Sequence, residues 1–156
     1  MRDERLLLTL VLVALLCVLL TKRVRCEDYT SQSLADKLLT LGVNSPNIGR
    51  IEFSPLEVKD VQGWNVGMLQ KFTSREGWRC SDYADTLFVF AKSRDIKACI
   101  GVIWFYIHPK VVLNRQAHAV NVFISKDGAF RFYDPSTQRE VSLTKDQIDS
   151  IYFCLF

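Results

Sequence analysis

The chain has 156 residues, of which 49% are hydrophobic and 12% aromatic, enough to bury the core of one domain. The net charge of +3 comes from the N-terminus, because residues 1–26 hold five Lys or Arg and two Asp or Glu, whereas residues 27–156 hold fifteen of each. That neutral remainder has no basic cluster, so the sequence gives no support for nucleic-acid binding.

The first 26 residues form a unit of their own. Two arginines precede a largely apolar run of 15 residues, Leu6–Leu20, and further basic residues follow it. This pattern is typical of a cleaved export signal. The alternatives are a retained membrane anchor, although a spanning helix needs about 20 apolar residues, and a buried core helix. We therefore expect a secreted or extracytoplasmic protein, or one tethered to a membrane through residues 6–20, with a single domain over residues 27–156.

Three helices are expected before residue 96. One covers about 31–41, where Ser31 or Thr30 can cap it and leucines at helical spacing form an apolar stripe. A second is expected over about 65–73. The third begins at Cys80, and its apolar stripe consists of Ala84, Leu87, Phe88 and Ala91.

After residue 96 the pattern changes to strands. Residues 99–107 are almost all apolar and rich in strand-forming types, which indicates a central strand. A loop and a hairpin follow. The remaining strands are expected at 117–124, 130–134, about 140–143 and 151–155, with a turn or helical start near 144–149. Helices followed by an antiparallel sheet indicate an α+β architecture.

Three cysteines lie beyond the N-terminal unit, namely Cys80, Cys99 and Cys154. Export would permit disulfides, and a Cys99–Cys154 pair is the natural choice if Cys80 is reserved for chemistry. The alternative is that Cys99 and Cys154 are simply small buried hydrophobic residues. The cysteines and histidines do not have the spacing of a zinc site.

Cys80, His118 and Asp134 supply a thiol, an imidazole and a carboxylate, the parts of a cysteine nucleophile, its base and the group that orients the base. The start of a helix favours the thiolate and offers backbone N–H groups to an oxyanion. Asp82 and Asp85 lie in the same first turns and oppose thiolate formation, so an imidazole partner is needed.

His118 is a better candidate for the base than His108, which precedes a proline at a strand end and is expected to be a solvated loop residue. His118 shares a strand face with apolar residues. A histidine in that setting is more often a satisfied core residue than a catalyst, and the nearby Asp134 is what favours catalysis.

The loop of the hairpin decides whether His118 and Asp134 can meet. A two-residue loop would put Asp134 on the opposite face from His118. A three-residue loop, 126–128, pairs Val120 with Asp134 and places Asp134 diagonal to His118 on the same face. Gly128 suits the left-handed last position of such a loop. The alternative is that Asp134 only begins a turn.

These motifs resemble those of the transglutaminase-like branch of the papain-like cysteine enzymes, with intervals of 38 and 16 residues between the three candidate residues. The resemblance covers about residues 75–136. Two features depart from the family: Val120 stands where Trp is frequent, and the usual Gly after the nucleophile helix is missing. The matching segments are Cys80-Ser81-Asp82-Tyr83-Ala84, Ala117-His118-Ala119-Val120-Asn121 and Tyr133-Asp134-Pro135-Ser136.

The resemblance implies an α+β fold of the papain-like or transglutaminase-like type, with the nucleophile helix packed on an antiparallel sheet. It implies Cys80 as nucleophile, His118 as base and Asp134 as orienting group, without metal or organic cofactor. Candidates for the oxyanion site or cleft lining are Ser81, Trp78 and Trp64, although core packing explains either tryptophan equally well.

The resulting hypothesis is an exported or membrane-tethered cysteine-dependent amide hydrolase, a peptidase or amidase, or an acyl transferase acting on a protein or peptide. One alternative is a non-catalytic exported binding module that retains the fold. Another is that Cys80 forms a structural disulfide.

Overall fold

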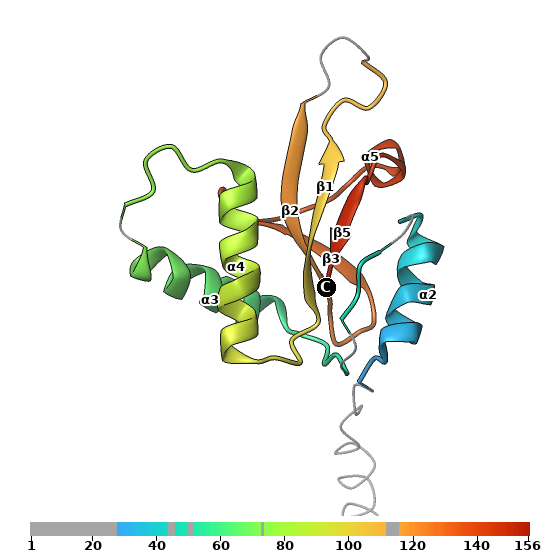
Figure 1. Cartoon of the computed structure of the whole chain (residues 1–156), viewed down its shortest axis with the longest axis horizontal. Coiled ribbons are helices and arrows are strands. Elements are labelled where there is room, and N and C mark those ends of the chain that lie inside the picture. The colour runs from blue at the N-terminus through green and yellow to red at the C-terminus, as the bar shows by residue number, and fades with distance from the viewer. Residues whose placement is uncertain (1–27, 44–45, 50–51, 73, 112–115) are drawn as a thin grey trace, which may run out of the picture.

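A five-stranded antiparallel sheet with the strand order β4-β3-β2-β1-β5 forms the centre of the molecule (Figure 1). The structure is a computed structural model that describes residues 28–43, 46–49, 52–72, 74–111 and 116–156. The expected signal or anchor over residues 1–26 lies outside the described residues. Among the helices that are described, none is long and apolar enough to cross a membrane.

Helices cover both faces of this sheet, with α3 and α4 on one side and α2 on the other (Figure 1). The elements are α2 (Ser31–Leu41), α3 (Val58–Lys71), α4 (Cys80–Arg94), β1 (Ile100–Tyr106), β2 (Ala117–Ile124), β3 (Phe130–Asp134), β4 (Arg139–Val141), α5 (Lys145–Asp149) and β5 (Phe153–Leu155).

The first helix matches its prediction. Thr30 caps α2 by accepting a hydrogen bond from the backbone N–H of Ser33 at 3.1 Å. Its buried face, Leu34 and Leu38, packs with Val120, Val122 and Ile124, which alternate along one face of β2. This cluster forms one half of the core.

The other half of the core lies between the sheet and α4. Leu87, Phe90 and Ala91 of α4 pack against Ile100 of β1 and Phe123 of β2. Because successive side chains of a strand point to opposite faces, β2 contributes its odd-numbered residues to this half and its even-numbered residues to the other.

The second helix is longer than the sequence predicts. We expect it over about 65–73, whereas α3 begins at Val58. Asp60 accepts a hydrogen bond from the backbone N–H of Glu57 at 3.1 Å and so fixes this earlier start. Gly63, which looks like a loop residue in the sequence, lies exposed inside α3.

The β2–β3 hairpin has the three-residue loop. The backbone N–H of Ser125 donates to the carbonyl of Ala129 at 2.9 Å, and Asn121 pairs with Tyr133 farther along the ladder. Gly128 has a φ of +81°, the left-handed conformation that this loop requires. The register that places Asp134 on the same face as His118 is therefore confirmed.

Gly101 offers a test of the close contact between β1 and the C-terminus. A Cβ at this position would lie 2.3 Å from the carbonyl oxygen of Leu155 and 2.8 Å from the ring of Phe156. We expect Gly101→Ala to lower the free energy of unfolding by about 1–3 kcal/mol, measured by urea denaturation of the full chain.

Gly63→Ala is the matched control, because a Cβ there meets nothing within 4 Å and the position lies inside α3. This substitution should raise the free energy of unfolding by about 0.5–1 kcal/mol. Equal urea midpoints for wild type and Gly101→Ala would show that the strands do not approach as closely as described.

Candidate active site

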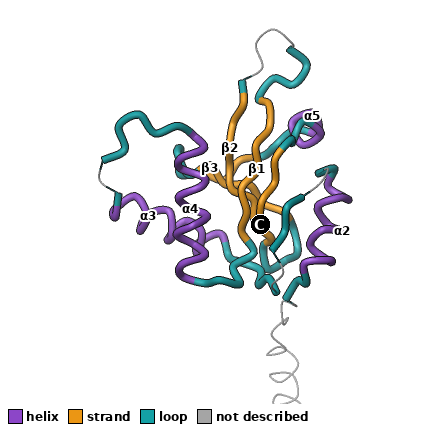
Figure 2. The backbone as a smooth tube through the Cα atoms, viewed as in Figure 1, coloured by secondary structure: helices purple, strands orange, loops and turns teal. Residues whose placement is uncertain are grey.

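A pocket of about 190 Å³ lies where the start of α4 meets the end of β1 and the start of β2. These three ends lie at the same end of the molecule (Figure 2). The pocket brings together residues that lie 38 positions apart in the chain. Its lining consists of Arg79, Cys80, Ser81, Trp104, Ala117, His118 and Ala119.

Cys80 is the first residue of α4 and is half-buried. The carboxylate of Asp82 accepts a hydrogen bond from the backbone N–H of Arg79 at 2.7 Å, so the helix begins at this point. The first N–H groups of a helix have no partner within the helix, and the helix dipole is positive there. Cys80 therefore lies at the positive end of the helix dipole, with the negative charge of Asp82 in the same turn.

Asn121 fixes the position of α4 relative to the sheet. Its side chain is completely buried, and its Nδ2 donates to the carbonyl of Ala84 in α4 at 3.0 Å and to that of Gly101 in β1 at 3.2 Å. One amide thus joins α4, β1 and β2 close to the pocket. The sequence reasoning did not single out Asn121, although a polar residue within an apolar strand was a signal for it.

His118 is held from two sides. Across the β1–β2 ladder it pairs with Phe105, and the two rings meet edge to face with centroids 5.8 Å apart. On the other side its Nε2 lies 3.1 Å from Oδ2 of Asp134. If Nε2 carries the proton for this bond, the neutral ring has Nδ1 as its proton acceptor.

Asp134 uses its two carboxylate oxygens for different purposes. Oδ2 contacts His118, whereas Oδ1 accepts hydrogen bonds from the backbone N–H and the hydroxyl of Ser136 at 2.9 and 2.6 Å. The backbone N–H of Thr137 adds a third bond to Oδ1 at 3.3 Å. The two interpretations of Asp134, turn residue and partner of His118, are therefore both correct.

These bonds keep the carboxylate charged. Burial raises the pKa of Asp134, but the hydrogen bonds from His118 and Ser136 outweigh it and lower the pKa to about 2. The side chain of Asp134 is 8% exposed and that of His118 is 24% exposed, so the pair lies at the edge of the core with the histidine facing outward.

Asn65 of α3 supports the turn after Asp134. It is fully buried, and its Nδ2 lies 3.3 Å from both the hydroxyl of Tyr133 and the carbonyl of Pro135. The residues on either side of Asp134 are thus tied to the helix layer. This contact, like that of Asn121, comes from a polar residue that the sequence reasoning did not select.

Cys80 and His118 border the same pocket, but no hydrogen bond joins them among the described residues. Such contacts are often long in a ligand-free enzyme and shorten when substrate binds. Tyr152 lies nearby: burial raises its pKa, and Tyr106 and Cys80 raise it further. The structure therefore places a thiol and an imidazole with its carboxylate at one pocket, and a phenol beside Trp104, which also lines that pocket.

Of the three candidates for the oxyanion site or the cleft lining, one lines the pocket and two do not. Ser81 lines the pocket. Trp78 instead packs edge to face on Tyr83 at 5.0 Å, and Trp64 packs against the core cluster beneath α4. The tryptophan that does line the pocket is Trp104 of β1. The sequence could not select it, because the length of the loop after β1 leaves its distance from His118 undetermined.

Cys99 and Cys154 are free thiols in the structure, so the disulfide considered for them is not formed, and the alternative of two small buried hydrophobic residues is confirmed. Both are buried, and burial raises the pKa of each thiol to about 12. They behave as small hydrophobic residues of the core next to α2. Cys80 is a free thiol too. Within the described ranges, no cluster of three or more His, Cys, Asp or Glu could hold a metal ion.

Comparison with known proteins gives a structural match only. No protein-family model and no curated protein sequence matches the chain. A Polyporus squamosus lectin, bound to the epitope Neu5Aca2-6Galb1-4GlcNAc, superposes with a TM-score of 0.62 and 16% identity over 83% of this chain and 49% of the lectin. A complex of PSL1a with E64 superposes with a TM-score of 0.63 and 16% identity, over 83% of this chain and 51% of that one. This chain thus spans about half the length of each.

This match corrects the fold class that the motif resemblance implies. An α+β fold of the papain-like or transglutaminase-like type was expected, and the solved structures that match are those of a lectin. The physical reason is that three short motifs specify only a helix start and a hairpin register, which unrelated frameworks can supply. At 16% identity the match concerns the fold alone.

The pair of His118 and Asp134 predicts a pH-dependent stability. Because the pKa of Asp134 falls from 3.8 to about 2 on folding, its stabilisation is present above pH 4 and is lost as the pH falls toward 2. We expect Asp134→Asn to lower the free energy of unfolding by about 2 kcal/mol at pH 6 and by progressively less below pH 4, measured by urea unfolding.

His118→Gln is the companion variant, because it keeps Asp134 and its bonds to Ser136 but removes the imidazole. The difference in free energy of unfolding between His118→Gln and wild type should also decrease at low pH. This decrease should be smaller than the one seen for Asp134→Asn. If the difference in free energy of unfolding between Asp134→Asn and wild type stays constant from pH 6 to 3, the pKa of Asp134 is not lowered by folding.

Proposed function

We propose that the chain is a cysteine-dependent amide hydrolase or acyl transferase in which Cys80 is the nucleophile, His118 the base and Asp134 the orienting carboxylate. The observation that carries the proposal is the hydrogen bond between His118 and Asp134 at the edge of a pocket that Cys80 also lines. A buried carboxylate that holds one ring nitrogen orients the other as a base.

The reaction follows from these roles. His118 Nδ1 takes the proton of Cys80, and the sulfur attacks the carbonyl carbon of the amide. The oxyanion that forms is stabilised by N–H groups at the start of α4. Collapse breaks the C–N bond, and the proton moves from His118 to the departing amine. Water or a second amine then attacks the thioester and restores Cys80.

Protein or peptide is the substrate class that fits this chemistry, because the pocket is open and carries a single full positive charge, Arg79. Hydrolysis needs only water as acceptor. The proposal includes the expected secreted or membrane-tethered location, which depends on residues 6–20 and is testable by fractionation.

A second candidate is a non-catalytic binding module, and the observation that favours it is the match to a lectin solved with a glycan. In that case the pocket would hold a carbohydrate, and Cys80 would be dispensable. The two candidates differ in whether the Cys80 thiol reacts with an electrophile faster than an ordinary thiol does.

The rate of Cys80 alkylation distinguishes them. We expect iodoacetamide and the epoxide E64 to modify Cys80 of the full chain at pH 6 about 100-fold faster than in His118→Ala, because the imidazole removes the thiol proton. The measurement is a time course of intact-protein mass, with Cys80→Ala to confirm the site.

His108→Ala is the matched control, because His108 lines a separate pocket with Pro109 and Gln147. It should react at the wild-type rate. Equal rates in wild type and His118→Ala would exclude the catalytic pair. Binding of a sialylated glycan that survives Cys80→Ala would then favour the binding module.

A further inference from the structure

Beyond the start of α4, no helix of the described residues covers the same face of the sheet. α4 covers Ile100 and Val102 of β1 but begins at Cys80, next to Trp104. Residues Trp104 and Tyr106 follow on this face of β1, and Phe153 of β5 pairs with Trp104. We propose that this uncovered face is a specificity site for an aromatic side chain of a peptide substrate, adjacent to the amide that Cys80 attacks.

The aromatic residues form one connected cluster, which we call the aromatic platform: Trp104, Tyr106, Tyr152 and Phe153. Trp104 meets the ring of Tyr152 at 6.3 Å and that of Phe153 at 5.9 Å, both edge to face. Tyr106 and Tyr152 stack at 4.9 Å. Such contacts fix the orientation of each ring, so the platform is preformed.

Two members of the platform are exposed although they are large and apolar, and the other two, Trp104 and Tyr106, are half-buried. Tyr152 is 49% exposed and Phe153 is 41% exposed. The backbone explains why they stay there: the N–H of Tyr152 donates to the carbonyl of Trp104 at 3.1 Å, so the chain before β5 is fixed beside β1. Exposed apolar side chains gathered in this way, rather than scattered, mark a binding surface.

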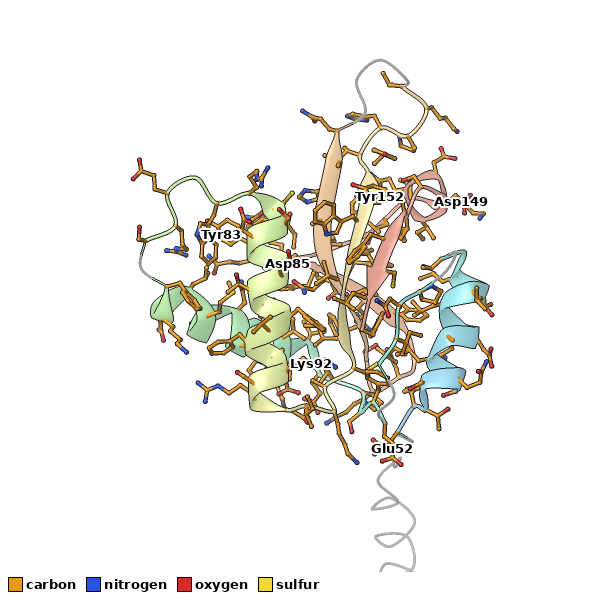
Figure 3. All side chains as sticks on the ribbon, in the orientation of Figure 1. Glu52, Tyr83, Asp85, Lys92, Asp149 and Tyr152 are labelled. Atoms are coloured by element: carbon orange, nitrogen blue, oxygen red, sulfur yellow. The ribbon has the colours of Figure 1, made fainter. Side chains whose placement is uncertain are left out.

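Trp104 makes the platform continuous with the pocket. It lines the cavity with Cys80 and His118, and it also contacts Tyr152 and Phe153. Figure 3 shows Tyr152 on the sheet side of α4, whereas Tyr83 lies on the other side of that helix. A substrate whose carbonyl carbon is at Cys80 therefore has its neighbouring residue beside the platform.

The chemistry of the platform favours an aromatic side chain over a sugar. A further ring can extend the edge-to-face pattern that Trp104 already makes with its neighbours. A sugar needs several polar groups around the ring it stacks on, and the platform offers two phenol hydroxyls and the indole N–H of Trp104, which is buried and has no hydrogen-bond partner among the described residues. The small side chains of Ala117 and Ala119 leave room beside His118 for the peptide backbone.

This inference rests on the proposed function, and a binding experiment separates the two. The full chain carrying Cys80→Ser, which cannot react, is titrated with N-acetyl-phenylalaninamide, N-acetyl-glycinamide and N-acetylglucosamine. Backbone amide signals in NMR spectra report the site. We expect the phenylalanine amide to shift residues 104, 106, 152 and 153, and the glycine amide to bind at least about fivefold more weakly.

Tyr152→Ser in the same background should weaken binding of the phenylalanine amide about fivefold. Tyr83→Ser is the matched control on the other side of α4 and should leave it unchanged. Phe153→Ser is a second platform variant, to be used if Tyr152→Ser unfolds. The proposal is overturned if the phenylalanine amide does not bind, or if it binds Tyr152→Ser as tightly as it binds the Cys80→Ser parent. It is also overturned if N-acetylglucosamine, and not the phenylalanine amide, binds at these residues. Slow alkylation of Cys80 would overturn only the catalytic role.

Discussion

The register of the β2–β3 hairpin is the constraint on which the candidate site depends. The three-residue loop that ends at Gly128 pairs Ser125 with Ala129, and the ladder then carries that register five residues along each strand to Val120 and Asp134. A slip by one residue would send Asp134 to the face that α4 covers and leave His118 without its carboxylate. A glycine with φ of +81°, six residues from the nearer member of the pair, thus determines whether the imidazole has a partner.

A second constraint places the thiol. α4 has little freedom to slide along the sheet, because the buried amide of Asn121 donates to a carbonyl of its second turn and to Gly101 of β1. An unpaired buried amide costs about 1–3 kcal/mol, so the helix start is fixed along the strand that carries His118. Asn65 acts in the same way on the turn that follows Asp134. Two buried amides therefore tie α4 to the sheet and the turn after Asp134 to α3.

Most local features could be predicted from the sequence, and the reasons are physical. The start of α4 at Cys80 follows from its apolar period, and the hairpin register follows from its glycine and from the need to keep Val120, Val122 and Ile124 on one face. The start of α3 could not be predicted in the same way, because Gly63 obscured it. The place of Trp104 in the pocket could not be predicted either, because it depends on His118, which lies beyond a loop in the chain. The framework around the site depends on how the elements are joined, which three motifs do not encode.

The difference between Asp134 and Cys80 explains why geometry alone leaves two functions in competition. Asp134 is immobilised before any ligand arrives, since Oδ1 accepts from Ser136 and Thr137 while Oδ2 contacts His118, and such preorganisation is what electrostatic catalysis needs. The same bonds also complete a turn, so they would be retained in a protein that only binds. Cys80 makes no side-chain hydrogen bond among the described residues, and its half-buried side chain packs against the small apolar cluster of Ala84, Val102 and Ala119. The position of the thiol fits either function, so its reactivity is the property that separates an enzyme from a binding module.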